Sequence, residues 1–273
     1  MIMQFSRTTT APRVGAVATL VLVLSVFVDS AVAQAPAPEE ALSRLERADA
    51  NWTYPDSDFS AEYRVVQDVP GEGRSVTLAA VFRRDRRDLY TIVILEPEVD
   101  SGQGYLKQGD TLWVYDPEAD RFNTTSSRER FQNTNARNSD FTQSTLAQDY
   151  DILSVEEATL GRHETWLYEL ESDKEGVTYP YMKAWITEDG RILKTEDYSR
   201  SRQLMRTTAV PEYRRIQSRL VPRQVYIIDM LEGAEIDGEF VHERTIITIT
   251  EPSFQAVPDS VFSKSFLERM SRR

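Results

Sequence analysis

The sequence predicts a mainly β protein built on one curved antiparallel sheet. From Asp58 onward, apolar and polar residues alternate in short runs, which is the period of a half-buried strand. Turn-forming residues separate the runs, as at Pro70 to Gly73 and Glu188 to Gly190, so neighbouring strands are expected to follow one another as hairpins. We expect about eleven strands, to within one or two. A sheet of that size twists until it curls, which favours a curved, partly closed barrel.

Two helices are expected, one near each end of the chain. Residues Glu39 to Asn51 carry Leu42, Leu45 and Ala48 at three-residue spacing, which predicts an amphipathic helix. A second helix is predicted from Asp259 to Met270. Both helices have an apolar side that needs cover, so we expect them to pack on the sheet.

Two strand-like runs are apolar at almost every position, and one long segment is polar. The runs Leu89 to Leu95 and Leu112 to Tyr115 leave no face for solvent, so something must cover both sides of these strands. One explanation is a second layer or a partner, and the other is a cavity for an acyl chain.

Ser126 to Tyr150 is polar except for a few residues, which predicts loop and short helix across the sheet.

Residues 1–33 are predicted to be a secretory signal peptide. Arg7 and Arg13 give a positive start, Val14 to Val28 are mostly apolar, and Ala31-Val32-Ala33 supplies the small residues of a cleavage site. The alternative is a membrane anchor, which needs about 20 apolar residues, and this run is shorter. We therefore expect cleavage after Ala33, export to the periplasm, and a single domain over residues 34–273.

Charge and cysteine content limit the partners of the protein. The chain has 44 acidic and 32 basic residues, a formal net charge of −12. Nucleic acids require a basic face, so no nucleic-acid partner is expected, and anionic lipid surfaces would repel the chain. An exported protein could form disulfides, but this sequence has no cysteine and must rely on its core. A monomer is the expected state.

Residue types that carry out catalysis are sparse. His163 and His242 are the only histidines, there is no thiol, and no Gly-x-Ser-x-Gly turn occurs. Each histidine precedes a glutamate, but neighbouring residues of a strand point to opposite faces, so neither pair makes a metal site by itself. We expect no enzyme, no catalytic residue, no metal and no cofactor. A glycosidase-like carboxylate pair stays open as an alternative.

The segment from Gly104 to Pro117 carries a family pattern. A glycine and a tyrosine precede a Gly-Asp turn and a Trp-x-Tyr-x-Pro sequence, formed by Gly104, Tyr105, Gly109, Asp110, Trp113, Tyr115 and Pro117. Arg121, Ser126-Ser127-Arg128 and Ser139-Asp140-Phe141 follow in the same order. With this pattern, the chain resembles the outer-membrane lipoprotein-sorting family, the LolA-like periplasmic lipoprotein carriers, and in particular an uncharacterised branch of it. The resemblance covers roughly Glu62 to Val210.

The resemblance implies an unclosed β half-barrel whose concave apolar face is capped by a few helices. Such a protein accepts the acyl chains of a lipoprotein or lipid and transfers them toward the outer membrane. An inner-membrane transporter would be the donor, and an outer-membrane component the acceptor. On this interpretation the candidate ligand-binding residues are large apolar side chains of the strands: Phe82, Ile92, Ile94, Trp113, Tyr115, Trp166, Tyr168, Trp185 and Ile186.

A second function is compatible with the same fold. A periplasmic sensor or accessory binding module would bind a membrane-derived ligand or another exported protein and regulate a membrane protein or transporter. A carrier binds acyl chains reversibly and passes them on, whereas a sensor binds its protein partner in a ligand-dependent way.

Overall fold

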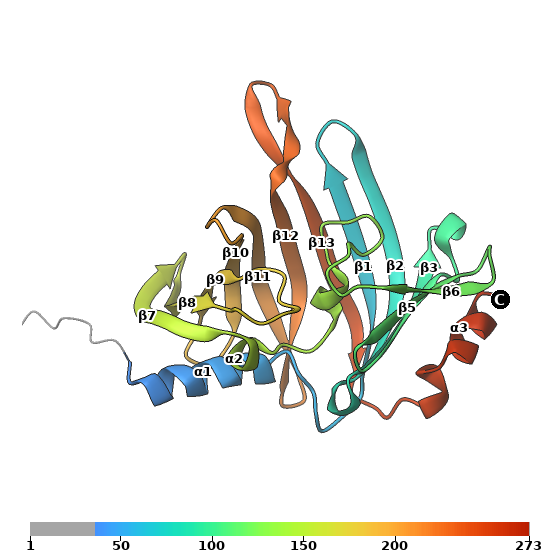
Figure 1. The fold of residues 1–273 in the computed structure, drawn as a ribbon, viewed down its shortest axis with the longest axis horizontal. Helices are drawn as coiled ribbons and strands as arrows, with labels where there is room; N and C mark the ends of the chain where they lie inside the picture. The colour runs from blue at the N-terminus through green and yellow to red at the C-terminus, as the bar shows by residue number, and fades with distance from the viewer. Residues whose placement is uncertain (1–35, 273) are drawn as a thin grey trace, which may run out of the picture. The chain divides into compact units, whose positions relative to one another are not determined.

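One antiparallel sheet of thirteen strands organises the chain (Figure 1). The computed structural model describes residues 36–272. The strands are β1 (Phe59–Val69), β2 (Gly73–Arg84), β3 (Leu89–Glu96), β4 (Gly104–Gln108), β5 (Thr111–Asp116), β6 (Arg121–Thr125), β7 (Asp151–Leu160), β8 (His163–Glu171), β9 (Tyr181–Ile186), β10 (Ile192–Tyr198), β11 (Leu204–Ile216), β12 (Arg219–Ile236) and β13 (Glu239–Ser253). The predicted mainly β, unclosed sheet is confirmed. Strand positions follow the predicted runs, and only the total exceeds the expected eleven.

The order of the strands brings the first and the last together in the middle of the sheet. It runs β6-β5-β4-β3-β2-β1-β13-β12-β11-β10-β9-β8-β7, so β1 pairs with β13 while every other pair is consecutive in the chain. The two edge strands of the sheet are therefore β6 and β7, which follow each other directly in the chain. Residues 126–150, which we call the crossing loop, must pass from one edge to the other over a face of the sheet (Figure 1).

One face of the sheet can be followed through directly opposite residues. Side chains on a strand alternate between faces, so cross-strand partners share a face. Tyr63 of β1 lies opposite Ile249 of β13, and Val225 of β12 lies opposite Ile247. The same face continues from Ile227 through Thr208, Thr195 and Ala184 to Tyr168 of β8. We call this the inner face, because the crossing loop packs on it.

Helix α1 (Pro38–Ala50) covers the inner face over β8 to β10. Leu45 and Ala48 are fully buried and pack with Tyr168, Ala184 and other residues of these strands. The predicted helix is confirmed, but one of its three predicted apolar residues, Leu42, is 42% exposed. Ala41 and Arg44 are buried instead. The guanidinium of Arg44 lies 4.4 Å from the centre of the Trp166 ring, which gives a charged side chain a place on the buried side.

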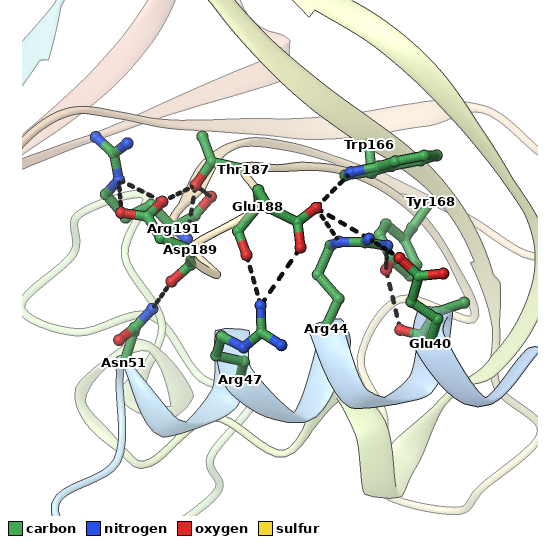
Figure 2. A network of polar contacts seen from close by, with 11 residues as sticks. Glu40, Arg44, Arg47, Asn51, Trp166, Tyr168, Thr187, Glu188, Asp189 and Arg191 are labelled. Carbon is green, nitrogen blue, oxygen red and sulfur yellow. Dashed lines mark hydrogen bonds and ion pairs between the residues drawn. The ribbon is translucent and has the colours of Figure 1, made fainter. Parts of the chain in front are cut away.

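Polar contacts fix α1 to the turn between β9 and β10 (Figure 2). Arg44 Nε donates to Glu188 Oε2 at 3.1 Å, and the indole N–H of Trp166 donates to the same oxygen at 3.0 Å. Arg47 donates to the Glu188 carbonyl at 2.6 Å, and the Asn51 amide donates to the Asp189 carbonyl at 3.0 Å. These polar contacts supplement the apolar packing of α1 on the sheet.

The C-terminal segment covers the outer face over β2 to β5. The predicted single helix from Asp259 to Met270 is wrong in its extent, because it is divided into the 3-10 helix η4 (Asp259–Val261) and α3 (Lys264–Met270). Ser263 begins the second helix by accepting a hydrogen bond from the Phe266 N–H at 3.3 Å. Leu267 is fully buried against Val93, Leu106 and Tyr115, and a Cβ at Gly104 would collide with it. The remaining helices are η1 (Asp85–Arg87), η2 (Glu98–Asp100), η3 (Asn138–Phe141) and α2 (Leu146–Asp149).

The two faces of β3 explain why its sequence is apolar throughout. Ile92 and Ile94 belong to the inner core with Phe131 and Phe141 of the crossing loop. Val93, between them, belongs to the outer cluster under Leu267. Both sides of this strand are therefore covered by other parts of the same chain. Within residues 36–272, no helix is long and apolar enough to cross a membrane.

Two leucines of α1 provide a matched test of this packing. Leu45 is 0% exposed, so Leu45→Ala should lower the free energy of unfolding by about 2–5 kcal/mol through lost burial and a cavity. Leu42→Ala should change it by less than about 0.5 kcal/mol, because Leu42 is already largely in solvent. Urea unfolding followed by circular dichroism measures both. Equal losses for the two variants would contradict the position of α1.

Candidate functional site

The crossing loop is held on the inner face by two phenylalanines. Phe131 and Phe141 are 0% and 1% exposed, and their ring centroids are 4.4 Å apart. Phe131 also packs on Tyr105 at 4.9 Å, and Phe141 on Tyr63 at 5.9 Å. The predicted loop with short helix is confirmed, and its few apolar residues belong to the core of the protein. The loop is thus part of the folded structure over the sheet.

Polar contacts fix both halves of the crossing loop. The Asn135 N–H donates to Thr245 Oγ1 at 2.8 Å, which attaches the first half of the loop to β13. At the other end, Asp49 of α1 accepts hydrogen bonds from the N–H groups of Leu146 and Ala147 at 2.9 and 2.8 Å. Burial raises the pKa of Asp49, despite these donors. α1 and the short helix α2 therefore form one connected unit.

A charged contact ties the middle of the loop to the sheet. Arg206, on the inner face of β11, donates to both oxygens of Asp140 at 3.0 and 2.9 Å and to Asp197 Oδ2 at 2.7 Å. Burial alone would lower the pKa of Arg206, but the two carboxylates raise it above its usual value. The guanidinium stays charged, and its removal would leave two carboxylates close together, one of them fully buried.

A cavity of about 540 Å³ lies between the inner face and the crossing loop. Its apolar floor comes from β1 and β11 to β13 and consists of Tyr63, Val210, Val225, Ile227, Ile247 and Ile249. The opposite wall is mostly polar, with Thr142, Gln143, Ser144 and Thr145 from the crossing loop and residues 174–179 beside them. The volume falls within the range of about 300–1,000 Å³ found for small-molecule sites. The lining therefore fits a molecule with an apolar part and a polar part.

Thr208 marks an unusual point in this cavity. It lines the floor opposite Ile227, and its hydroxyl is buried without a hydrogen-bond partner among residues 36–272. Buried hydroxyls are normally hydrogen-bonded, so a free one in a cavity is a position where a ligand can donate or accept.

The nine predicted ligand-binding residues are divided between the two faces. Ile92, Ile94, Trp166, Tyr168 and Ile186 lie on the inner face, the first two in the core with the crossing loop and the other three under α1. On the outer face lie Phe82, Trp113 and Tyr115, near the C-terminal segment, and Trp185, whose ring is 4.5 Å from Lys194 Nζ. None of the nine lines the cavity, and their role as ligand contacts stays a prediction.

The sequence interpretation missed the residues of the cavity floor. Val225, Ile227, Ile247 and Ile249 stand at alternate positions in predicted strands, so the pattern marked them as one face of a strand. The pattern gave no sign that β12 and β13 lie at the centre of the sheet, beneath the crossing loop.

Metal-binding geometry is lacking in the described part of the chain. No group of three or more histidine, cysteine, aspartate or glutamate residues within residues 36–272 is placed to hold a metal ion. His163 begins β8, and His242 lies far from it on β13, with its ring 5.0 Å from Phe240. The predicted signal peptide, residues 1–33, lies outside the described residues.

Comparison with known sequences assigns the family. A family described as uncharacterized protein-like has a sequence profile that matches residues 86–269, more than half of the chain. The chain belongs to this family. Its match begins in η1 and ends in α3, so it includes the crossing loop and most of the cavity floor. A comparison with curated proteins gives no match.

Solved structures show the same fold and confirm the resemblance to LolA-like proteins. A LolA superfamily protein from Nitrosomonas europaea is 22% identical, with a TM-score of 0.69 over 83% of this chain and 98% of its own. A domain described as an outer membrane lipoprotein-sorting protein, from Vibrio parahaemolyticus, is 17% identical, with a TM-score of 0.72 over 84% and 98%. A DUF1329 family protein from Desulfovibrio piger is 18% identical, with the same TM-score and coverage. The chain has the LolA-like fold.

The contact between Asp140 and Arg206 should control how tightly the crossing loop is held. Asp140→Asn removes a charge from this pair, so local opening should become easier by about 1–3 kcal/mol. Amide hydrogen exchange at Phe131 and Asn138 measures this opening. Their N–H groups donate to carbonyl groups within the loop at 2.8 and 3.0 Å. We expect exchange at least about fivefold faster. Asp110→Asn, in an exposed turn, is the control, and unchanged exchange in Asp140→Asn would contradict the assigned contact.

Proposed function

We propose that this protein is an exported periplasmic carrier that shields acyl chains of a lipoprotein or lipid and transfers them toward the outer membrane. The observation that carries the proposal is the apolar floor of the cavity under the crossing loop. A floor made mainly of aliphatic side chains is suited to hydrocarbon, and the charged residues of the lining, which include Arg83, Lys107 and Arg206, could face a polar head group.

The physical chemistry of the cavity supports binding that is useful and reversible. Each methylene moved from water to an apolar surface contributes about 0.8 kcal/mol, so affinity grows with the length of chain that enters. The hydroxyl and amide groups of residues 142–145 would face the polar end of the molecule. A bound lipid of this kind keeps its apolar part out of water and needs no covalent step.

The crossing loop is the element that would admit the cargo. It forms the polar wall of the cavity, and charged or polar contacts rather than a covalent link hold it at Asp140 and Asn135. Opening it requires that these contacts break together with the packing of two phenylalanines. In this proposal the cargo comes from an inner-membrane transporter and goes to an outer-membrane acceptor. The Vibrio domain with the same fold is described as a lipoprotein-sorting protein, which agrees with this route.

Adjacent threonines on β11 provide a direct test of the cavity. Thr208 faces the cavity opposite Ile227, whereas Thr207 faces the other side opposite Ile228. Thr208→Phe places a ring in the space for the acyl chain, and Thr207→Phe places the same ring on the outer face. Titration with a fluorescent fatty acid should show binding by the wild type and by Thr207→Phe. Thr208→Phe should bind at least about tenfold more weakly, the loss of about two buried methylenes.

Thermal unfolding provides the control for this pair, since both variants must remain folded. Thr208→Met, with a smaller and more flexible side chain, serves if the phenylalanine disturbs the fold, and it should weaken binding by a smaller factor. Equal binding by folded Thr208→Phe and the wild type would contradict the cavity as the site. No binding by the wild type would contradict the carrier and favour the accessory module that binds a protein partner.

A further inference from the structure

The hairpin of β12 and β13 extends beyond its neighbours in the sheet. On one side, the last registered pair of β12 with β11 is Asp229 with Arg206. On the other, the last pair of β13 with β1 is Arg244 with Asp68. Beyond these points the pairs from Gly233 with His242 to Ile236 with Glu239 join the two strands only to each other. The extension appears at the end of these strands in Figure 1. We call residues 231–241 the hairpin tip.

Both outer edges of the hairpin tip therefore present unpaired backbone groups. Edge strands are places where another chain can add a strand, and proteins usually shield them. The tip also carries large apolar side chains in solvent: Leu231, Ile236, Phe240 and Val241 are 38 to 50% exposed. Lysine and proline, which protect edges, are lacking in this segment. The combination marks the tip as a docking surface.

The charge of the tip defines the chemistry of its partner. Glu232, Glu235, Asp237 and Glu239 are exposed and alternate with the apolar residues, and none forms a salt bridge within residues 36–272. Near the base, burial together with repulsion from neighbours that include Glu232 raises the pKa of Glu243. A partner must therefore bring positive charge, and an anionic lipid surface or a nucleic acid would be repelled.

We propose that the hairpin tip is the docking site for an extended, basic segment of a partner protein. Phe240 shares one face of the hairpin with Glu235, and Val241 shares the other face with Glu239. The segment adds a strand to the free edge, places apolar side chains beside the apolar residue of one face, and pairs lysine or arginine side chains with the carboxylates of the other. This surface is separate from the cavity, whose lining includes no residue of the tip. Its base contacts the crossing loop, because Arg130 forms a salt bridge with Asp229 at 3.0 Å.

Synthetic peptides test the proposal on the intact purified protein. A peptide of alternating lysine and valine should bind, with an affinity that falls as salt rises, whereas a peptide of alternating glutamate and valine should not. The same lysine peptide with N-methylated backbone amides should bind at least about tenfold more weakly, since it cannot complete strand pairing. Isothermal titration calorimetry measures all three. Equal binding of the lysine and glutamate peptides, or no loss on N-methylation, would overturn the proposal.

Substitutions locate the binding at the tip. The double variant Phe240→Ser and Val241→Ser should weaken binding of the lysine peptide at least about tenfold. Val99→Ser, at a residue of η2 that is 77% exposed, should leave binding unchanged. The double variant Glu235→Lys and Glu239→Lys should reverse the preference to the glutamate peptide. It involves only exposed positions, so it remains informative if the first pair disturbs folding. A folded charge variant that keeps the original preference would overturn the assignment.

Two further measurements on the same variants distinguish other occupants of the hairpin tip. Binding to phosphatidylglycerol vesicles that is lost in Phe240→Ser with Val241→Ser would overturn the protein-partner assignment in favour of a lipid surface. Self-association in sedimentation, lost in the same variant, would assign the tip to a second copy of the chain and overturn the proposal as well.

Discussion

The antiparallel pairing of β1 with β13 is the constraint on which the rest of the structure depends. It joins two hairpin series that grow outward from the centre, one ending at β6 and the other beginning at β7. Because these edges are consecutive in the chain, their connection must pass over the sheet. The crossing loop, whose Phe131 and Phe141 are buried against the sheet, follows from this arrangement, and so does the position of the cavity between loop and sheet.

The two ends of the described chain cover opposite faces of the sheet. α1 packs on the inner face over β8 to β10, and α3 packs on the outer face over β3 to β5. The part of the inner face that neither helix covers lies under the crossing loop, where the cavity is found. The loop is held by the Asp140 to Arg206 contact, by Asn135, by the Arg130 to Asp229 salt bridge and by two aromatic rings. All of these contacts are non-covalent, so the loop can open and close reversibly, as the proposed binding of a lipid requires.

Local patterns predicted the elements well and their arrangement poorly. Alternation marked the strands because each has a different exposure on its two sides, and three-residue spacing marked α1 through Leu45 and Ala48. Leu42 shares that spacing but lies off the buried side, because residues three apart on a helix of 3.6 residues per turn shift by about 60° at each step. The cavity floor depends on the pairing of Tyr63 with Ile249, residues far apart in sequence, and no local pattern encodes such a contact. The large aromatic residues drew attention instead, and several of them, such as Trp113, belong to the outer face.

The central claim is that the cavity under the crossing loop holds acyl chains, and native mass spectrometry of the protein tests it most directly. The protein is expressed in its own host and purified without detergent, and whatever it carries is extracted and identified. The account predicts added mass that corresponds to a lipid, an acyl chain or an acylated peptide, and loss of that mass in Thr208→Phe. A protein that emerges with its bare mass and takes up no added lipid would contradict it.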